Sequence, residues 1–161
     1  MLANNHMKII SASLGAVLLA VSCLHNLAHA TETLEITRPW VREAPPSAQV
    51  LAAYMSIKNT GESTVTIIGI SSPEFESAEI HRTVINEGIA SMQPAKQLDI
   101  LAHGNIKLEP GGLHLMLFNP QRTLSAGDSV TLTIHVSNGT CMTVTAPVIR
   151  QTGADHSQHH H

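Results

Sequence analysis

The amino-acid sequence predicts an all-β fold, an antiparallel sandwich or barrel, and three observations support this class. Short runs of β-branched and alternating apolar residues recur along the chain, with turn residues between them at intervals of roughly 8–12 residues. No window has the periodicity of an amphipathic helix. The tandem prolines Pro45-Pro46 and the dipeptide Asn138-Gly139 interrupt the apolar runs as breaks and hairpin turns of a sheet protein do.

Each expected strand alternates between two faces, so one set of side chains is assigned to the core. In the run 129–136 the apolar set is Val130, Leu132, Ile134 and Val136, and Met55 is likewise assigned to the core. The expected strands, in chain order, are Thr33–Thr37, Pro39–Arg42, Val50–Lys58, Ser63–Ile70, Ala78–Val84, Ile89–Met92, Gln97–Leu101, Asn105–Leu108, Leu113–Phe118, Ser129–Val136 and Thr140–Val148.

Three segments of different character divide the chain. Residues 1–30 have the pattern of a secretory signal peptide, with Lys8, an apolar run over residues 9–24 and a cleavage pattern at Ala28-His29-Ala30. Residues 31–150 form the predicted β-domain. Residues 151–161 are polar and histidine-rich, and are expected to be a disordered tail. Export is therefore predicted.

Two other readings of the N-terminal segment remain open. It is short for a membrane anchor, and lipidation at Cys23 lacks the leucine usually found three residues before a lipidated cysteine. Met7 is an alternative start that gives a more compact signal. Removal of the signal would leave Cys141 as the only cysteine, so no internal disulfide is expected.

The composition argues against several functional classes. Basic residues are scattered singly and the aromatics are few, which gives nucleic-acid binding little support. The chain contains no GxSxG elbow, phosphate loop or H-E-x-x-H motif, and no carboxylate pair beside a base is evident. Enzymatic catalysis is therefore not expected.

An unusual strand face carries the main functional signal. In the run 113–118, Leu113, Leu115 and Leu117 share the expected core face, so His114 and Met116 share the opposite one. An imidazole and a thioether side by side are neutral ligands, and thioethers favour soft ions such as Cu(I). Taken singly, a strand histidine is more often a surface residue and a methionine is more often core.

The complete pattern His81-x10-Met92-x21-His114-x-Met116 resembles the signature of the PCuAC family of periplasmic copper chaperones. Flanking segments agree with it over residues 34–148, including Trp40-Val41-Arg42 and Pro110-Gly111-Gly112. The resemblance implies a cupredoxin-like antiparallel β-sandwich of Greek-key type. It also implies one Cu(I) ion held by His81, Met92, His114 and Met116.

The resemblance further implies a periplasmic carrier that gives copper to a partner. The expected partner is subunit II of cytochrome c oxidase, with its binuclear copper site, or another copper chaperone. A blue-copper electron-transfer site uses two histidines and a cysteine as ligands. No histidine follows Cys141 in its expected strand, so this class of copper protein is not expected. The alternatives are an envelope protein that sequesters copper, a secreted metalloenzyme, or a sandwich with no metal function.

The C-terminal tail is a second and softer candidate. His156, His159, His160 and His161 form a set of imidazoles that suits Cu(II) or other divalent ions. The alternative is a passive tail or the remnant of a purification tag. His103 and His135 are assigned to a loop and to a strand surface, and Cys141 has no counterpart in the family pattern.

Overall fold

The computed structural model describes residues 34–151, and every regular element in that range is a β-strand. The strands are β1 (Leu34–Arg42), β2 (Val50–Asn59), β3 (Val65–Ser71), β4 (Phe75–Asn86), β5 (Ile89–Pro94), β6 (Leu98–Ile100), β7 (Asn105–Leu108), β8 (Leu113–Pro120), β9 (Ser129–Val136) and β10 (Cys141–Ile149). The predicted all-β class is therefore confirmed. In this range no helix is long and apolar enough to cross a membrane.

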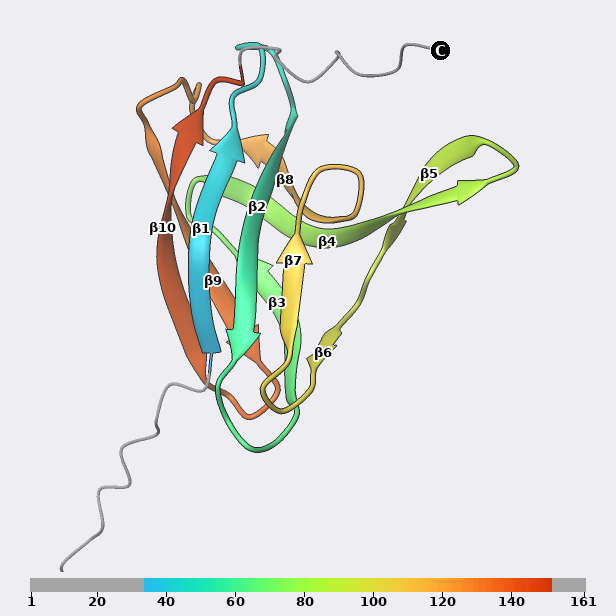
Figure 1. Ribbon diagram of the computed structural model, residues 1–161. Helices are drawn as coiled ribbons and strands as arrows, with labels where there is room; N and C mark the ends of the chain where they lie inside the picture. Colours follow the sequence, from blue (N-terminus) through green and yellow to red (C-terminus); the bar gives the residue numbers. More distant parts are fainter. Residues whose placement is uncertain (1–33, 152–161) are drawn as a thin grey trace, which may run out of the picture. The chain divides into compact units, whose positions relative to one another are not determined.

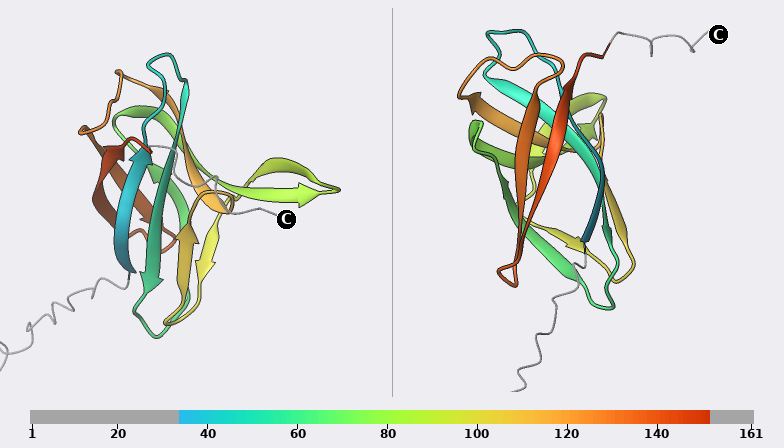
Figure 2. Two further views of the ribbon diagram at one scale, coloured as in Figure 1. Left: turned by 45° about the horizontal axis from the view of Figure 1, so that its top comes forward. Right: turned by 90° about the vertical axis from the view of Figure 1, so that its left-hand side faces the viewer.

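The strands form one continuous sheet that folds over into two layers (Figures 1 and 2). The order is β5-β4-β8-β7-β2-β1-β10-β9-β3-β6, and the layers join where β1 and β10 pair in parallel. We call β5, β4, β8, β7, β2 and β1 the first layer, and β10, β9, β3 and β6 the second. Most pairings are antiparallel, but β7 and β8 also pair in parallel.

Aliphatic side chains from both layers fill the space between them. Leu115 and Leu117 of β8 are fully buried, and so are Leu132 and Ile134 of β9. The core faces predicted for these two strands are therefore confirmed at these residues. Met55 is also buried, at 3% exposure. Apolar burial of this kind is the main force that holds two sheets together.

The first strand differs from the expectation in one respect. Residues 34–42 form a single strand, although the sequence predicted two. Its register with β2 shifts between Thr37 and Trp40, and Arg38 has a φ of 51°. A β-bulge at this point, with Arg38 in a left-handed conformation, lets the strand continue past it.

A buried asparagine ties the loops at one end of the sandwich. Asn59 ends β2 and has no exposed surface. Its Nδ2 donates to the carbonyls of Ser63, Ile100 and Leu101 at 2.7, 3.0 and 3.0 Å, and its Oδ1 accepts from the amide of Gly61 at 2.9 Å. These bonds satisfy the buried side-chain amide of Asn59 and tie it to separate stretches of backbone.

The hairpin formed by β4 and β5 extends away from the two layers as an arm (Figure 1). All six residues of β5 are exposed. Its turn contains Glu87 and Gly88 at φ values of 51° and 81°, the pair of positive angles that a type I′ hairpin turn requires. The arm therefore depends on its own turn and ladder more than on packing.

Candidate metal centre

All four residues of the predicted ligand set lie on one face of the first layer. His81 of β4 is directly opposite His114 of β8, and Met116 of β8 is opposite Glu79. Met92 of β5 is opposite Thr83, two residues beyond His81. Directly opposed residues, and residues two apart in a strand, share a face. This face is turned away from the leucine core.

The two histidines form the centre of this face. Their ring centroids lie 6.2 Å apart, with an angle of 36° between the ring planes. The His114 residue is only 6% exposed and the His81 side chain only 12%. Phe118 of β8 lies beside His81, with ring centroids 6.4 Å apart. The imidazoles are thus sheltered from water, unlike those of an ordinary surface strand.

Hydrogen bonds define which ring nitrogens remain available. The carboxylate of Glu79 accepts from Nε2 of His81 at 2.9 Å, and the carbonyl of Gly112 accepts from Nδ1 of His114 at 3.1 Å. Because both partners are acceptors, each ring carries its proton on that nitrogen. In the neutral imidazoles, Nδ1 of His81 and Nε2 of His114 therefore keep their lone pairs.

One of these lone pairs is an anomaly in a folded protein. Nδ1 of His81 is buried and has no hydrogen-bond partner. A buried polar atom without a partner is costly and calls for an explanation, such as an ion that the site is built to receive. An imidazole whose other nitrogen is held by a carboxylate is the usual arrangement of a metal ligand.

The two methionines occupy different surroundings. Met116 is partly buried in the body of the sandwich, between Glu79 on β4 and Ala52 on β2. Met92 lies on the arm and is 60% exposed. Three of the four side chains therefore belong to the body of the fold, and the fourth is presented from the projecting hairpin.

An aromatic pair extends the same face beyond Met116. Trp40 and Tyr54 are directly opposed on β1 and β2, with ring centroids 4.5 Å apart. The guanidinium of Arg42 lies 5.7 Å from the centre of the Tyr54 ring. Burial raises the pKa of the Tyr54 hydroxyl, and the nearby Arg42 charge opposes that shift. Tyr54 lies two residues beyond Ala52, the residue opposite Met116, and therefore on the same face.

Glu79 is the residue of this face that the sequence reasoning missed. The signal was present, because Glu79 lies two residues before His81 in an expected strand and therefore shares its face. Residues 34–151 contain no cluster of three or more His, Cys, Asp or Glu side chains able to hold a metal. Any metal held on this face would need its thioethers.

The remaining candidates separate clearly. His103 lies in an exposed loop with Nε2 3.2 Å from Glu62, and His135 lies on the surface of β9, so both ordinary assignments are confirmed. The predicted signal peptide at 1–30 lies outside the described residues. So do the tail residues His156, His159, His160 and His161.

Comparison with known proteins decides the family. A family model described as "Putative lipoprotein LpqE-like" matches residues 34–148, which is nearly the whole described range. The chain belongs to the LpqE-like family. Among individual relatives, the putative lipoprotein Lxx21020 of Leifsonia xyli subsp. xyli is 30% identical over 154 residues, covering 90% of this chain and 92% of that protein.

The fold of this LpqE-like chain is similar to that of solved PCuAC domains. The copper-bound PCuAC domain of PmoF2 superposes with a TM-score of 0.63 at 19% identity, covering 74% of this chain and 94% of the domain. The Cu(I) form of DR1885 from Deinococcus radiodurans is 30% identical, with a TM-score of 0.56, covering 71% of this chain and 75% of DR1885. The resemblance to the PCuAC family and the cupredoxin-like fold are therefore confirmed.

Proposed function

We propose that this LpqE-like protein is an exported carrier of Cu(I). The ion is bound by Nδ1 of His81, Nε2 of His114 and the thioethers of Met92 and Met116. The observation that carries the proposal is the buried, unpartnered Nδ1 of His81, on the same face as the partly buried thioether of Met116. An ion at this position removes the cost of the unpartnered atom.

The donor set selects the ion. Two neutral imidazoles and two thioethers are soft or borderline ligands, which favour Cu(I) over hard cations that need oxygen donors. No carboxylate or thiolate balances the ion in this set, so the centre carries a net positive charge. Glu79 lies behind His81 and moderates this charge without binding the ion directly.

The position of Met92 supports a carrier over a permanent copper site. Its side chain is largely exposed on a hairpin that packs little against the rest of the fold. A ligand on such an arm can leave the ion while the two imidazoles and Met116 still hold it. Four protein ligands leave no open position for a substrate, so the same set does not favour a metalloenzyme.

Delivery to a partner is the second part of the proposal. The copper goes to the binuclear site of cytochrome c oxidase subunit II or to another copper chaperone, in the periplasm. Membership in a family described as lipoprotein-like supports export, and the Cu(I) form of the related DR1885 supports the ion. A Cu(II) site at the tail histidines stays a prediction.

The decisive experiment is an anaerobic Cu(I) titration of the full chain against a competing chelator. All proteins carry Cys23→Ser, Cys141→Ser and alanine at the four tail histidines, which removes both thiols and the tail imidazoles as competing ligands. We expect tight binding with mixed nitrogen and sulfur scattering in X-ray absorption. Met116→Leu should weaken binding at least tenfold, while the core substitution Met55→Leu should leave it unchanged.

Transfer is tested by mixing the loaded chain with the apo, soluble copper domain of an oxidase subunit II. A carrier loses its copper to that domain on mixing. Binding without any transfer, to this domain or to a second copper chaperone, would instead indicate a sequestering protein. Equal effects of Met116→Leu and Met55→Leu on affinity would rule out the ligand set.

A further inference from the structure

A second pair of metal-ligating side chains lies on the opposite layer of the sandwich. Cys141 begins β10 and is directly opposite His135 of β9. The thiol Sγ lies 3.3 Å from Nδ1 of His135. Cys141 is exposed and is the free cysteine of the described range. Neither residue belongs to the predicted copper face.

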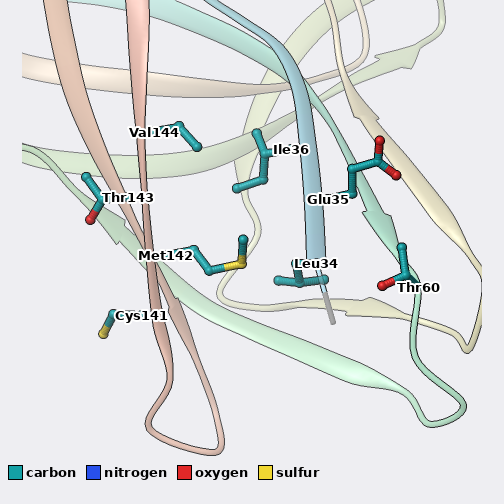
Figure 3. A pocket seen from close by; sticks show the side chains of 8 residues that line it. All are labelled: Leu34, Glu35, Ile36, Thr60, Cys141, Met142, Thr143 and Val144. Carbon is teal, nitrogen blue, oxygen red and sulfur yellow. The ribbon is translucent and has the colours of Figure 1, made fainter. Parts of the chain in front are cut away.

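The two side chains point outward together. Figure 3 shows Met142 and Val144 turned toward Leu34 and Ile36, while Cys141 and Thr143 point to the other side of β10. His135 is on this outer side, because directly opposed residues of an antiparallel pair share a face. The thiol and the imidazole are therefore accessible from solvent as a pair.

A third side chain contacts the second ring nitrogen of this imidazole. Nε2 of His135 lies 2.8 Å from the hydroxyl oxygen of Ser71 on β3. A thiol that donates to Nδ1 requires the proton of the ring to be on Nε2, which then donates to Ser71. In that tautomer the Nδ1 lone pair faces the thiol. Metal-ligating histidines commonly have their second nitrogen held in this way.

The geometry suits a metal ion in place of the shared thiol proton. An ion about 2.3 Å from a thiolate sulfur and about 2.0 Å from an imidazole nitrogen would join two atoms that are 3.3 Å apart at an angle of about 100°. That angle is close to tetrahedral, so the two atoms need not move apart, and a rotation of the imidazole brings its Nδ1 lone pair onto the ion.

Space is also available around the pair. Gly69 of β3 is directly opposite His135 and contributes no side chain, and a Cβ built there would meet no atom within 4 Å. Incoming ligands can therefore approach from the β3 side. The neighbouring Thr133 and Thr143 are paired with each other, Oγ1 to Oγ1 at 3.3 Å.

We propose that Cys141 and His135 form a second, two-ligand site for Cu(I) on the outer face of the second layer. Thiolate is the softest ligand available in proteins, and imidazole also suits copper. Binding releases the thiol proton to solvent, and the remaining positions are open to water or to a ligand of another molecule. This site does not depend on the His81–His114 centre.

The test follows alkylation of Cys141 by iodoacetamide under anaerobic conditions, with mass spectrometry as the readout. The full chain carries Cys23→Ser, and Cu(I) is added from a weak chelator. We expect Cu(I) to slow alkylation at least tenfold. The same protection should appear in a His114→Ala chain, which separates this site from the proposed carrier centre.

A matched pair of variants tests the imidazole. His135→Gln should remove most of the protection, whereas His103→Gln, which changes an exposed loop histidine, should leave it intact. Three results would overturn the proposal: no protection by Cu(I), equal protection in His135→Gln, or protection that occurs only with dimer formation by size-exclusion chromatography. Circular dichroism of His135→Gln shows whether the fold is retained.

Discussion

Nδ1 of His81 has no hydrogen-bond partner although it is buried, and the ring of His114 lies directly across the ladder with its centroid 6.2 Å away. The relation arises from the register of β4 and β8, which opposes the two histidines and puts Met116 opposite Glu79. A shift of one residue would turn either histidine into the leucine core. The proposed copper face therefore depends on strand register.

Glu79 is predicted to orient His81 for the proposed ion. Its carboxylate accepts from Nε2 of His81 at 2.9 Å, which leaves Nδ1 as the only ring nitrogen able to bind. Glu79→Gln should lower the Cu(I) affinity about 10- to 100-fold, the range typical for loss of such a partner. Chelator competition measures the affinity, and ¹⁵N NMR of the His81 ring reports its tautomer.

Glu76→Gln is the matched control for that experiment. Glu76 is exposed on the same strand and accepts from Asn119 at 2.7 Å, outside the histidine pair. This variant should bind Cu(I) as the parent protein does. An unchanged affinity and unchanged His81 tautomer in Glu79→Gln would mean that the carboxylate plays no positioning role.

The β4–β5 arm is predicted to unfold locally more easily than the sandwich. Gly88 has a φ of 81° at the hairpin turn, and an added Cβ there would meet no neighbour, so the cost of Gly88→Ala is backbone strain alone. We expect a local cost of about 1 kcal/mol. Amide hydrogen exchange in residues 89–93 should accelerate, while the melting temperature of the sandwich changes little.

Gly69→Ala provides the contrast. Gly69 also has open space around its Cβ position, but it lacks a positive φ. Its substitution should leave exchange in the arm unaltered. If Gly88→Ala instead lowered the melting temperature as much as a core substitution does, the arm would have to be an integral part of the folding unit.

Asn59 is predicted to be a main determinant of stability. Asn59→Ala removes a fully buried amide and leaves the carbonyls of Ile100 and Leu101 without this donor. The expected loss is about 3 kcal/mol, given the cost of unsatisfied buried groups. Urea denaturation measures it. Asn105→Ala, an exposed change at the start of β7, should cost far less, and similar losses in both would contradict the prediction.

An ion pair near the C-terminal end of β10 should make stability fall in acid. Hydrogen bonds from the Arg150 side chain and from the Ala126 amide lower the pKa of Glu43 from 4.5 to about 2. Because the folded-state pKa is the lower one, this contribution is complete above about pH 5 and is lost as the pH falls toward 2.

Glu43→Gln should therefore flatten the acid limb of the stability curve. Urea unfolding of the parent and the variant between pH 6 and about pH 2 measures the difference. Glu87→Gln, at the exposed turn of the arm, should follow the parent curve. Parallel curves for the parent and Glu43→Gln would show that the Arg150 pair contributes nothing to the acid transition.

Sequence periodicity located most strands, because alternation of Val130, Leu132, Ile134 and Val136 directly reflects burial of one sheet face. It divided β1 in two, with separate strands at Thr33–Thr37 and Pro39–Arg42. Only the paired partner β2 shows that the interruption is a bulge. Periodicity also could not predict that Asn59 ties loops together, because its partners Ile100 and Leu101 are distant in the chain.

The sequence by itself determined the fold class, the family and the residues that share the His114–Met116 face, because these follow from local alternation and fixed spacing. Tertiary structure alone decided that His81 opposes His114, that Nδ1 of His81 is left without a partner, and that Met92 projects on an arm. It also brought Cys141 against His135. These relations depend on register between strands, which local periodicity does not specify.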